Sequence, residues 1–69
     1  MGQYVSPPAP HPRAEQIACE FHAEYEALAP LFGYRTRQES AVPWSEVPSH
    51  NRELMKATVT RLLERGVIR

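Results

Sequence analysis

The fold is decided by the C-terminal stretch 48-PSHNRELMKATVTRLLERGVIR-69, which predicts one amphipathic helix with both ends marked. Pro48 suits the first helical turn, where a missing backbone N–H is no loss. Gly66 suits the left-handed position that ends many helices, and Val67 then takes the apolar place of a Schellman motif, opposite Leu62. Apolar side chains recur here at helical spacing: Leu54, Met55, Val59, Leu62 and Leu63.

A second long helix, over residues 14–29, must cover this apolar stripe, because no other segment is long enough. Its own apolar side chains also follow helical spacing: Ile17, Phe21, Tyr25, Leu28 and Phe32. Pro30 and Gly33 end the helix, with room for one irregular turn between them. Residues 34–42 form the longest connection, and a short element around Trp44 follows. We therefore expect an all-α fold of two main antiparallel helices plus a short helical turn.

The 69 residues allow one small domain. Four of the seven prolines fall within residues 1–13, which predicts a Pro-rich, extended and flexible arm there and a helical domain over residues 14–69. The expected core is Ile17, Phe21, Tyr25, Leu28, Leu31, Phe32, Tyr34, Val42, Trp44, Val47, Leu54, Met55, Val59, Leu62, Leu63, Val67 and Ile68. So small a core leaves a thin margin of stability, which favours a homodimer or a stabilising partner, and the sequence leaves both open.

Composition argues against several classes of function. The net charge is zero, so the chain as a whole has no electrostatic preference for nucleic acid or membrane. Cys19 is the single cysteine, and the three histidines have no metal-ligand spacing, so we expect no metal, no cofactor and no enzymatic activity. No apolar run reaches membrane-spanning length. We expect a cytoplasmic protein that does not enter a membrane.

Charge is divided between the two helices. All eight acidic residues are Glu, and four of them lie in the first helix: Glu15, Glu20, Glu24 and Glu26. The last segment carries basic residues at positions 52, 56, 61, 65 and 69. This pattern predicts either two antiparallel helices with complementary outer faces or a basic face for an acidic partner.

The connection between the helices holds a group of aromatic and basic residues: Tyr34, Arg35, Arg37 and Trp44. Arginine and aromatic side chains are common anchors of protein interfaces, and two arginines can grip an anion. We predict a binding site for a partner or an anion here. The alternative is that Tyr34 and Trp44 belong to the core and the arginines are merely solvated.

Two patterns in the chain are similar to those of a known family. The run from Ile17 through His22 and Tyr25 to Gly33-Tyr34-x-Thr-Arg37 resembles the first half of the ryanodine receptor (RyR) domain. The run from Pro43-Trp44-x-Glu-Val-Pro48 through the last helix to Gly66 resembles its second half. The resemblance covers roughly residues 14 to 69. It implies a stand-alone bacterial or phage module that binds a protein partner, in the host cytoplasm if phage-encoded.

The last helix also has a rival interpretation as a DNA-binding element. The run Thr58-Val-Thr-Arg-Leu followed by Arg65-Gly-Val-Ile-Arg is similar to the recognition helix and first wing strand of winged-helix proteins. The basic face in this alternative is Arg52, Lys56, Arg61 and Arg65. A non-enzymatic protein-interaction module is the leading prediction, and a DNA-binding protein is the alternative.

Overall fold

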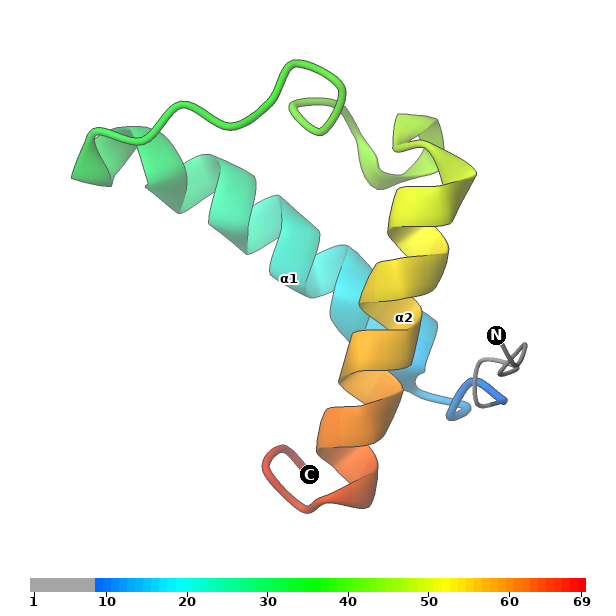
Figure 1. The fold of residues 1–69 in the computed structure, drawn as a ribbon. Helices are drawn as coiled ribbons and strands as arrows, with labels where there is room; N and C mark the ends of the chain where they lie inside the picture. The colour runs from blue at the N-terminus through cyan, green and yellow to red at the C-terminus, as the bar shows by residue number, and fades with distance from the viewer. Residues whose placement is uncertain (1–8) are drawn as a thin grey trace, which may run out of the picture.

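A computed structural model describes residues 9–69, and these are all-α. Helix α1 (Ala14–Leu28) leads into the 3-10 helix η1 (Ala29–Phe32), and after a connection the 3-10 helix η2 (Trp44–Glu46) precedes helix α2 (Ser49–Glu64). In Figure 1, α1 rises and α2 descends, and the two helices splay apart from a contact at the N-terminal half of α1. The predicted fold class is confirmed, but the helices cross steeply instead of lying side by side.

Helix α2 ends as its sequence predicts. Gly66 has φ 72°, which is the left-handed region. The Val67 N–H donates to the Leu62 carbonyl oxygen at 3.0 Å and the Gly66 N–H donates to the Leu63 carbonyl oxygen at 3.1 Å. These two bonds define the predicted Schellman motif. At the other end the boundary differs by one residue: Pro48 is the extended N-cap, and the helix begins at Ser49.

A second Schellman motif follows α1, at the end of the 3-10 helix η1. Gly33 has φ 78°, the Tyr34 N–H donates to the Ala29 carbonyl oxygen at 2.9 Å, and the Gly33 N–H donates to that of Pro30 at 3.1 Å. Because Pro30 has no N–H, the α-helical bonding cannot continue through it, and the chain tightens into η1. The predicted irregular turn between Pro30 and Gly33 is confirmed.

The two helices meet through small side chains. Ala14 and Ala18 of α1 are fully buried and form a cluster with Val59 of α2. Alanines one turn apart let the α2 backbone approach closely, so this side of α1 makes the contact. Residues that pack partly buried around the cluster are Ile17, Trp44, Met55, Leu63 and Ile68.

The expected core is therefore wrong for eight of its members, although Trp44, the largest of them, packs half-buried against the cluster. The buried hydrophobic residues are Ala14, Ala18, Ala29, Val47 and Val59. Large side chains that we expected inside are exposed instead: Phe21, Tyr25, Leu28, Leu31, Phe32, Tyr34, Leu54 and Val67. The physical reason is that the apolar stripe of α1 lies beside the alanine stripe, and the helices pack through the alanines.

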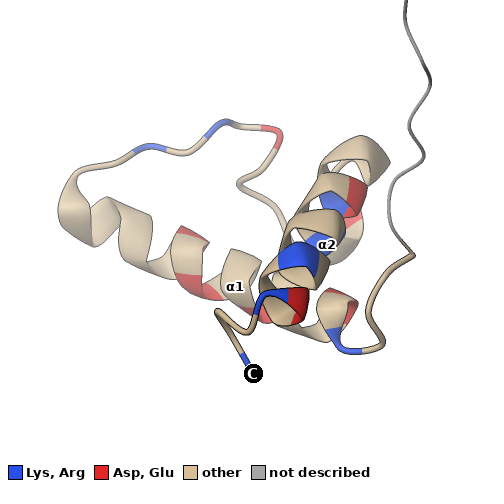
Figure 2. Cartoon of the chain, turned by 60° about the horizontal axis from the view of Figure 1, so that its bottom comes forward, with Lys and Arg blue, Asp and Glu red and all other residues tan. Residues whose placement is uncertain are grey.

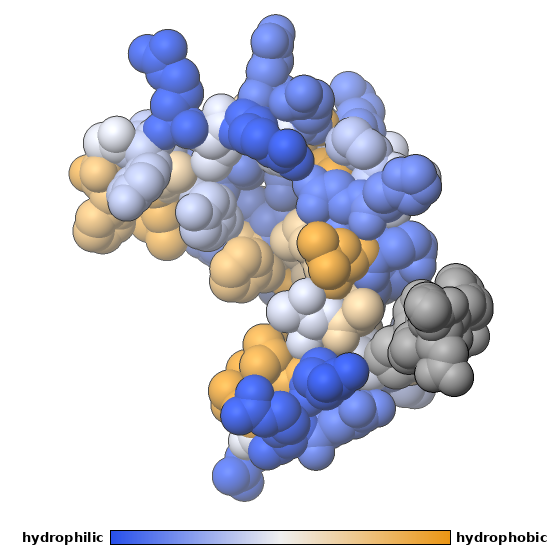
Figure 3. Space-filling model, in the orientation of Figure 1, coloured by the Kyte–Doolittle hydropathy of each residue, from blue (hydrophilic) through white to orange (hydrophobic). Residues whose placement is uncertain are grey.

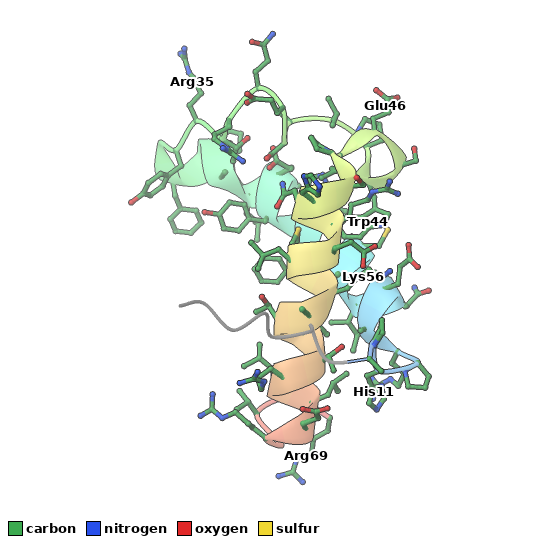
Figure 4. All side chains as sticks on the ribbon, turned by 45° about the vertical axis from the view of Figure 1, so that its right-hand side comes forward. His11, Arg35, Trp44, Glu46, Lys56 and Arg69 are labelled. Atoms are coloured by element: carbon green, nitrogen blue, oxygen red, sulfur yellow. The ribbon has the colours of Figure 1, made fainter. Side chains whose placement is uncertain are left out.

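Most of the predicted N-terminal arm, residues 1–8, lies outside the described residues. Its described end contacts α2. The His11 N–H donates to the Thr60 Oγ1 at 3.0 Å, and Arg13 Nη2 donates to the Arg69 carbonyl oxygen at 3.1 Å. Figure 4 shows His11 beside the lower half of α2. These bonds fix where α1 starts relative to the C-terminal half of α2.

Candidate functional site: an exposed apolar face

The most distinctive surface of the molecule is a set of large apolar side chains left open on one side of both helices. Phe21, Tyr25, Phe32 and Tyr34 are exposed at 58%, 51%, 76% and 70%. We name the apolar face by its members: the exposed Phe21, Tyr25, Leu28, Phe32 and Tyr34 from the α1 side, and the exposed Leu54 with the half-buried Met55 and Leu62 from α2. Figure 3 shows apolar residues on both arms of the concave surface. Soluble monomers rarely leave so many aromatic rings in water on one side.

The two arms of this face join at a hollow. Phe21, Tyr25 and Tyr34 line it from the α1 side and Met55 lines it from α2, around a volume of about 390 Å³. The Phe21 and Tyr25 rings stack at a centroid distance of 5.8 Å, with 23° between their planes. A second hollow continues outward along α1, where Leu28 and Phe32 join Tyr25 and Tyr34. The α1 part of the face, together with Met55, is thus a continuous surface and not a scatter of single residues.

The four residues of the predicted binding site, Tyr34, Arg35, Arg37 and Trp44, do not all lie together in the structure. Tyr34, Arg35 and Arg37 do line one hollow, the same one that Phe21 and Tyr25 line. Trp44 is not part of it, because it lines a different hollow with Cys19, Ala23 and Pro43. In Figure 4 Arg35 points outward from the connection between the helices. Three of the four predicted residues therefore border the apolar face, and the fourth does not.

Trp44 is half-buried and packs against the alanine cluster between the helices. Its Nε1–H donates to a Glu15 carboxylate oxygen at 3.4 Å. Lys56 Nζ lies 4.0 Å from the other oxygen of Glu15 and 3.2 Å from Glu53. Trp44 and Lys56 thus connect η2, the start of α1 and the middle of α2 through one carboxylate. This arrangement suits a structural role for the indole.

His22 holds the long connection against α1. Its side chain is buried, its Nε2 is 2.7 Å from the Val42 carbonyl oxygen, and its ring lies 5.9 Å from that of Trp44. A carbonyl oxygen only accepts hydrogen bonds, so Nε2 carries the hydrogen. His22 also lines the main hollow, so this bond positions the loop that borders the apolar face.

His22→Ala is expected to lower the free energy of unfolding by roughly 1–3 kcal/mol, because it removes a buried side chain and leaves the partly buried Val42 carbonyl without its partner. Urea unfolding followed by circular dichroism measures this change. His50→Ala, at an exposed position in the first turn of α2, is the matched control and should be neutral. Equal stability of the two variants would contradict the assigned bond.

The four basic residues of the DNA-binding alternative do not share one side of α2. Arg52 and Arg61 are nine residues apart, which is about two and a half turns, so they lie on opposite sides of the helix. Arg52 and Lys56 are half-buried, and Nε of Arg52 is buried without a hydrogen-bond partner among residues 9–69. Arg61 and Arg65 are exposed and line a shallow hollow with Thr58 and Leu62. They border the apolar face from its α2 side.

Within residues 9–69, no three His, Cys, Asp or Glu side chains gather as metal ligands, and Cys19 is a free cysteine. Neither helix of this described region is long and apolar enough to span a membrane. Comparisons with protein-family models, curated proteins and solved structures found no match for this chain. The resemblance to the RyR domain stays a prediction from the sequence.

Phe21, Tyr25, Leu28 and Phe32 were expected in the core, and their exposure was not predicted from the sequence. A signal for their exposure was present. Ala14, Ala18 and His22 repeat every four residues, beside the large apolar stripe. A helix with two adjacent stripes can pack through either of them. Packing through the stripe of small side chains lets the two helix backbones come closer together.

Proposed function

We propose that this chain is a non-enzymatic interaction module that binds a protein through the apolar face. The observation that carries the proposal is the exposure of Phe21, Tyr25, Phe32 and Tyr34, each at half or more of its surface, on one side of the molecule. Covering such side chains removes apolar surface from water at roughly 25 cal/mol per Å². The free energy gained drives association with another apolar surface.

The composition of the face also fits a protein partner. Aromatic residues and arginine are enriched at protein interfaces, and Trp, Tyr and Arg are frequent among the few residues that dominate the binding energy. The main hollow combines Phe21, Tyr25 and Tyr34 with the exposed Arg35 and Arg37 at its border. This arrangement has an apolar centre and a charged rim.

The resemblance to the RyR domain supports the same class of function. It further suggests a small bacterial or phage protein that works in the cytoplasm. The all-α architecture of residues 9–69 is compatible with such a module.

DNA binding is the second candidate, and the observation in its favour is the exposed pair Arg61 and Arg65, one turn apart on α2. It has less support, because Arg52 and Lys56 lie on the opposite side and Lys56 is engaged with Glu15 and Glu53. A recognition helix needs several basic contacts on one side to neutralise phosphates.

Photo-crosslinking in the cells that make the protein tests the leading proposal. Phe32 is replaced by the photoreactive analogue p-benzoylphenylalanine, and the same analogue at Ala27 is the matched control. Both positions are exposed near the end of α1. Discrete protein adducts are expected from position 32 and not from position 27.

Adducts in equal yield from both positions, or none from position 32, would contradict a binding role for the apolar face. Adducts with nucleic acid, together with loss of duplex binding in Arg61→Glu/Arg65→Glu, would favour the DNA alternative.

A further inference from the structure

We infer that the occupant of the apolar face is a second copy of this chain, in a two-fold homodimer that sets α1 of each copy against α2 of the other. The inference rests on the proposed function and names the partner for the same surface. Three independent features of the described residues support it. They are the small size of the core within one copy, the area of the apolar face, and the opposite charges along the α1 and α2 borders of that face, which we call its rims.

The core of a single copy contains little that holds so small a domain together. Its largest fully buried side chains are Val47 and Thr60, and the centre of the helix contact is Ala14, Ala18 and Val59. Small domains usually need many buried large apolar side chains per residue, or else oligomerisation. Here the large apolar side chains are present but exposed, so burying them between two copies supplies the missing core.

The size of the apolar face matches what a stable dimer needs. At roughly 200 Å² per aromatic side chain, the exposed fractions of Phe21, Tyr25, Phe32 and Tyr34 leave about 500 Å² of aromatic surface in water. Leu28 and Leu54, exposed at 47% and 65%, extend this area. A standard interface buries about 800 Å² per partner. The face therefore approaches the area of a complete interface.

Along helix α1 itself the rim of the face is acidic, while Arg35 and Arg37 border the main hollow from the connection. Glu24 lies three residues after Phe21 and four before Leu28, so it borders the apolar stripe, and Glu20 lies one turn before it. Both are exposed, and Glu20 accepts a hydrogen bond from Gln16. Helix α1 contains four Glu and no Lys or Arg. In Figure 2 the charged segments of α1 are accordingly all red, the colour of acidic residues.

The α2 rim of the face is basic. Arg61 lies seven residues, about two turns, after Leu54, and so falls on the same side of α2. Arg65 lies one turn further and lines the same hollow as Leu62. Both arginines are exposed.

The charges of the two rims are not neutralised within one copy. The ion pairs of residues 9–69 join Lys56 to Glu15 and to Glu53, and neither rim takes part. The acidic rim of α1 and the basic rim of α2 therefore form no ion pair with each other within the described residues.

A two-fold axis through the apolar face brings opposite rims together. In such an isologous interface each contact occurs twice, with the partners exchanged. The acidic rim of one copy (Glu20 and Glu24) then meets the basic rim of the other (Arg61 and Arg65), while the aromatic rings fill the concave space between the arms. Each copy thus carries both an acidic and a basic rim, so two copies match each other in charge. An unrelated protein would have to carry the same pair of rims to match this surface equally well.

A charge-exchange experiment tests the inference by sedimentation velocity over a range of protein concentrations. One variant carries Glu20→Arg and Glu24→Arg, so both its rims are basic. The other carries Arg61→Glu and Arg65→Glu, so both its rims are acidic. Wild type is expected to shift to twice the monomer mass as concentration rises. Each variant alone should dimerise about tenfold more weakly or worse, and their equal mixture should recover the dimer.

Glu39→Arg/Glu46→Arg is the matched control, since it changes net charge as much as Glu20→Arg/Glu24→Arg but at exposed positions in the connection and at the end of η2. It should dimerise like wild type. A wild-type chain that stays monomeric, yet gives adducts with another protein from position 32, would overturn the homodimer and leave the proposed function standing. A monomer that gives no adducts would overturn both. If both charge-reversed variants dimerise with the same dissociation constant as wild type, the proposed pairing of acidic and basic rims is overturned.

Discussion

Phe32→Asp is expected to leave the chain folded and make it monomeric. The ring is 76% exposed in one copy, so its loss costs the fold little. In the dimer, the same position buries a carboxylate in an apolar interface, and removing an aromatic anchor typically costs 2 kcal/mol or more. The dissociation constant should rise by at least about thirtyfold, measured by sedimentation velocity.

Ala27→Asp is the control for this prediction. It adds the same carboxylate to α1 at an exposed position, two residues from Tyr25 and so on the opposite side of the helix. Its association should equal that of wild type. If Phe32→Asp associates as tightly as Ala27→Asp, the apolar face is not the interface.

Ala18→Leu is expected to remove roughly 1–3 kcal/mol from the free energy of unfolding, because Ala18 is fully buried where α1 meets Val59. The total free energy of unfolding of a domain of this size rarely exceeds about 3–5 kcal/mol. The midpoint of thermal unfolding should therefore fall by about 10 °C. Circular dichroism at one fixed protein concentration measures the change, because dimerisation makes stability concentration-dependent.

Ala27→Leu makes the same change of side chain at an exposed position of the same helix. It should be nearly neutral, since alanine and leucine are both good helix formers. If Ala18→Leu proves as stable as Ala27→Leu, then α1 does not meet α2 through its alanines. The large stripe of Phe21 and Tyr25 would then be the packed side.

The elements of this fold were accessible from the sequence because their signals are local. Gly33 and Gly66 mark helix ends through their left-handed backbone, and Pro30 interrupts the α-helical bonding after Leu28. Which side of α1 packs was not accessible in the same way. Periodicity identifies an apolar stripe, but the contact also depends on how closely the backbones approach, which Ala14 and Ala18 decide.

The candidate site was predicted in part for the same reason. Tyr34, Arg35 and Arg37 are close in sequence, so their proximity in space follows from the chain itself. Trp44 was grouped with them, but it packs against the alanine cluster instead. The larger part of the face, on α1 and α2, depends on the angle between the helices, and no local pattern determines that angle.

The most direct test of this account is an isotope-filtered NOE experiment on an equal mixture of ¹³C-labelled and unlabelled chain. It detects only contacts between copies. We predict NOEs from the aromatic rings of Phe21 and Phe32 in one copy to the methyl groups of Leu54 and Leu62 in the other. If the filtered experiment shows none of these NOEs, and a conventional NOESY on the fully labelled chain places the same rings beside Val59 and its neighbours, then the large stripe is core and the apolar face does not exist.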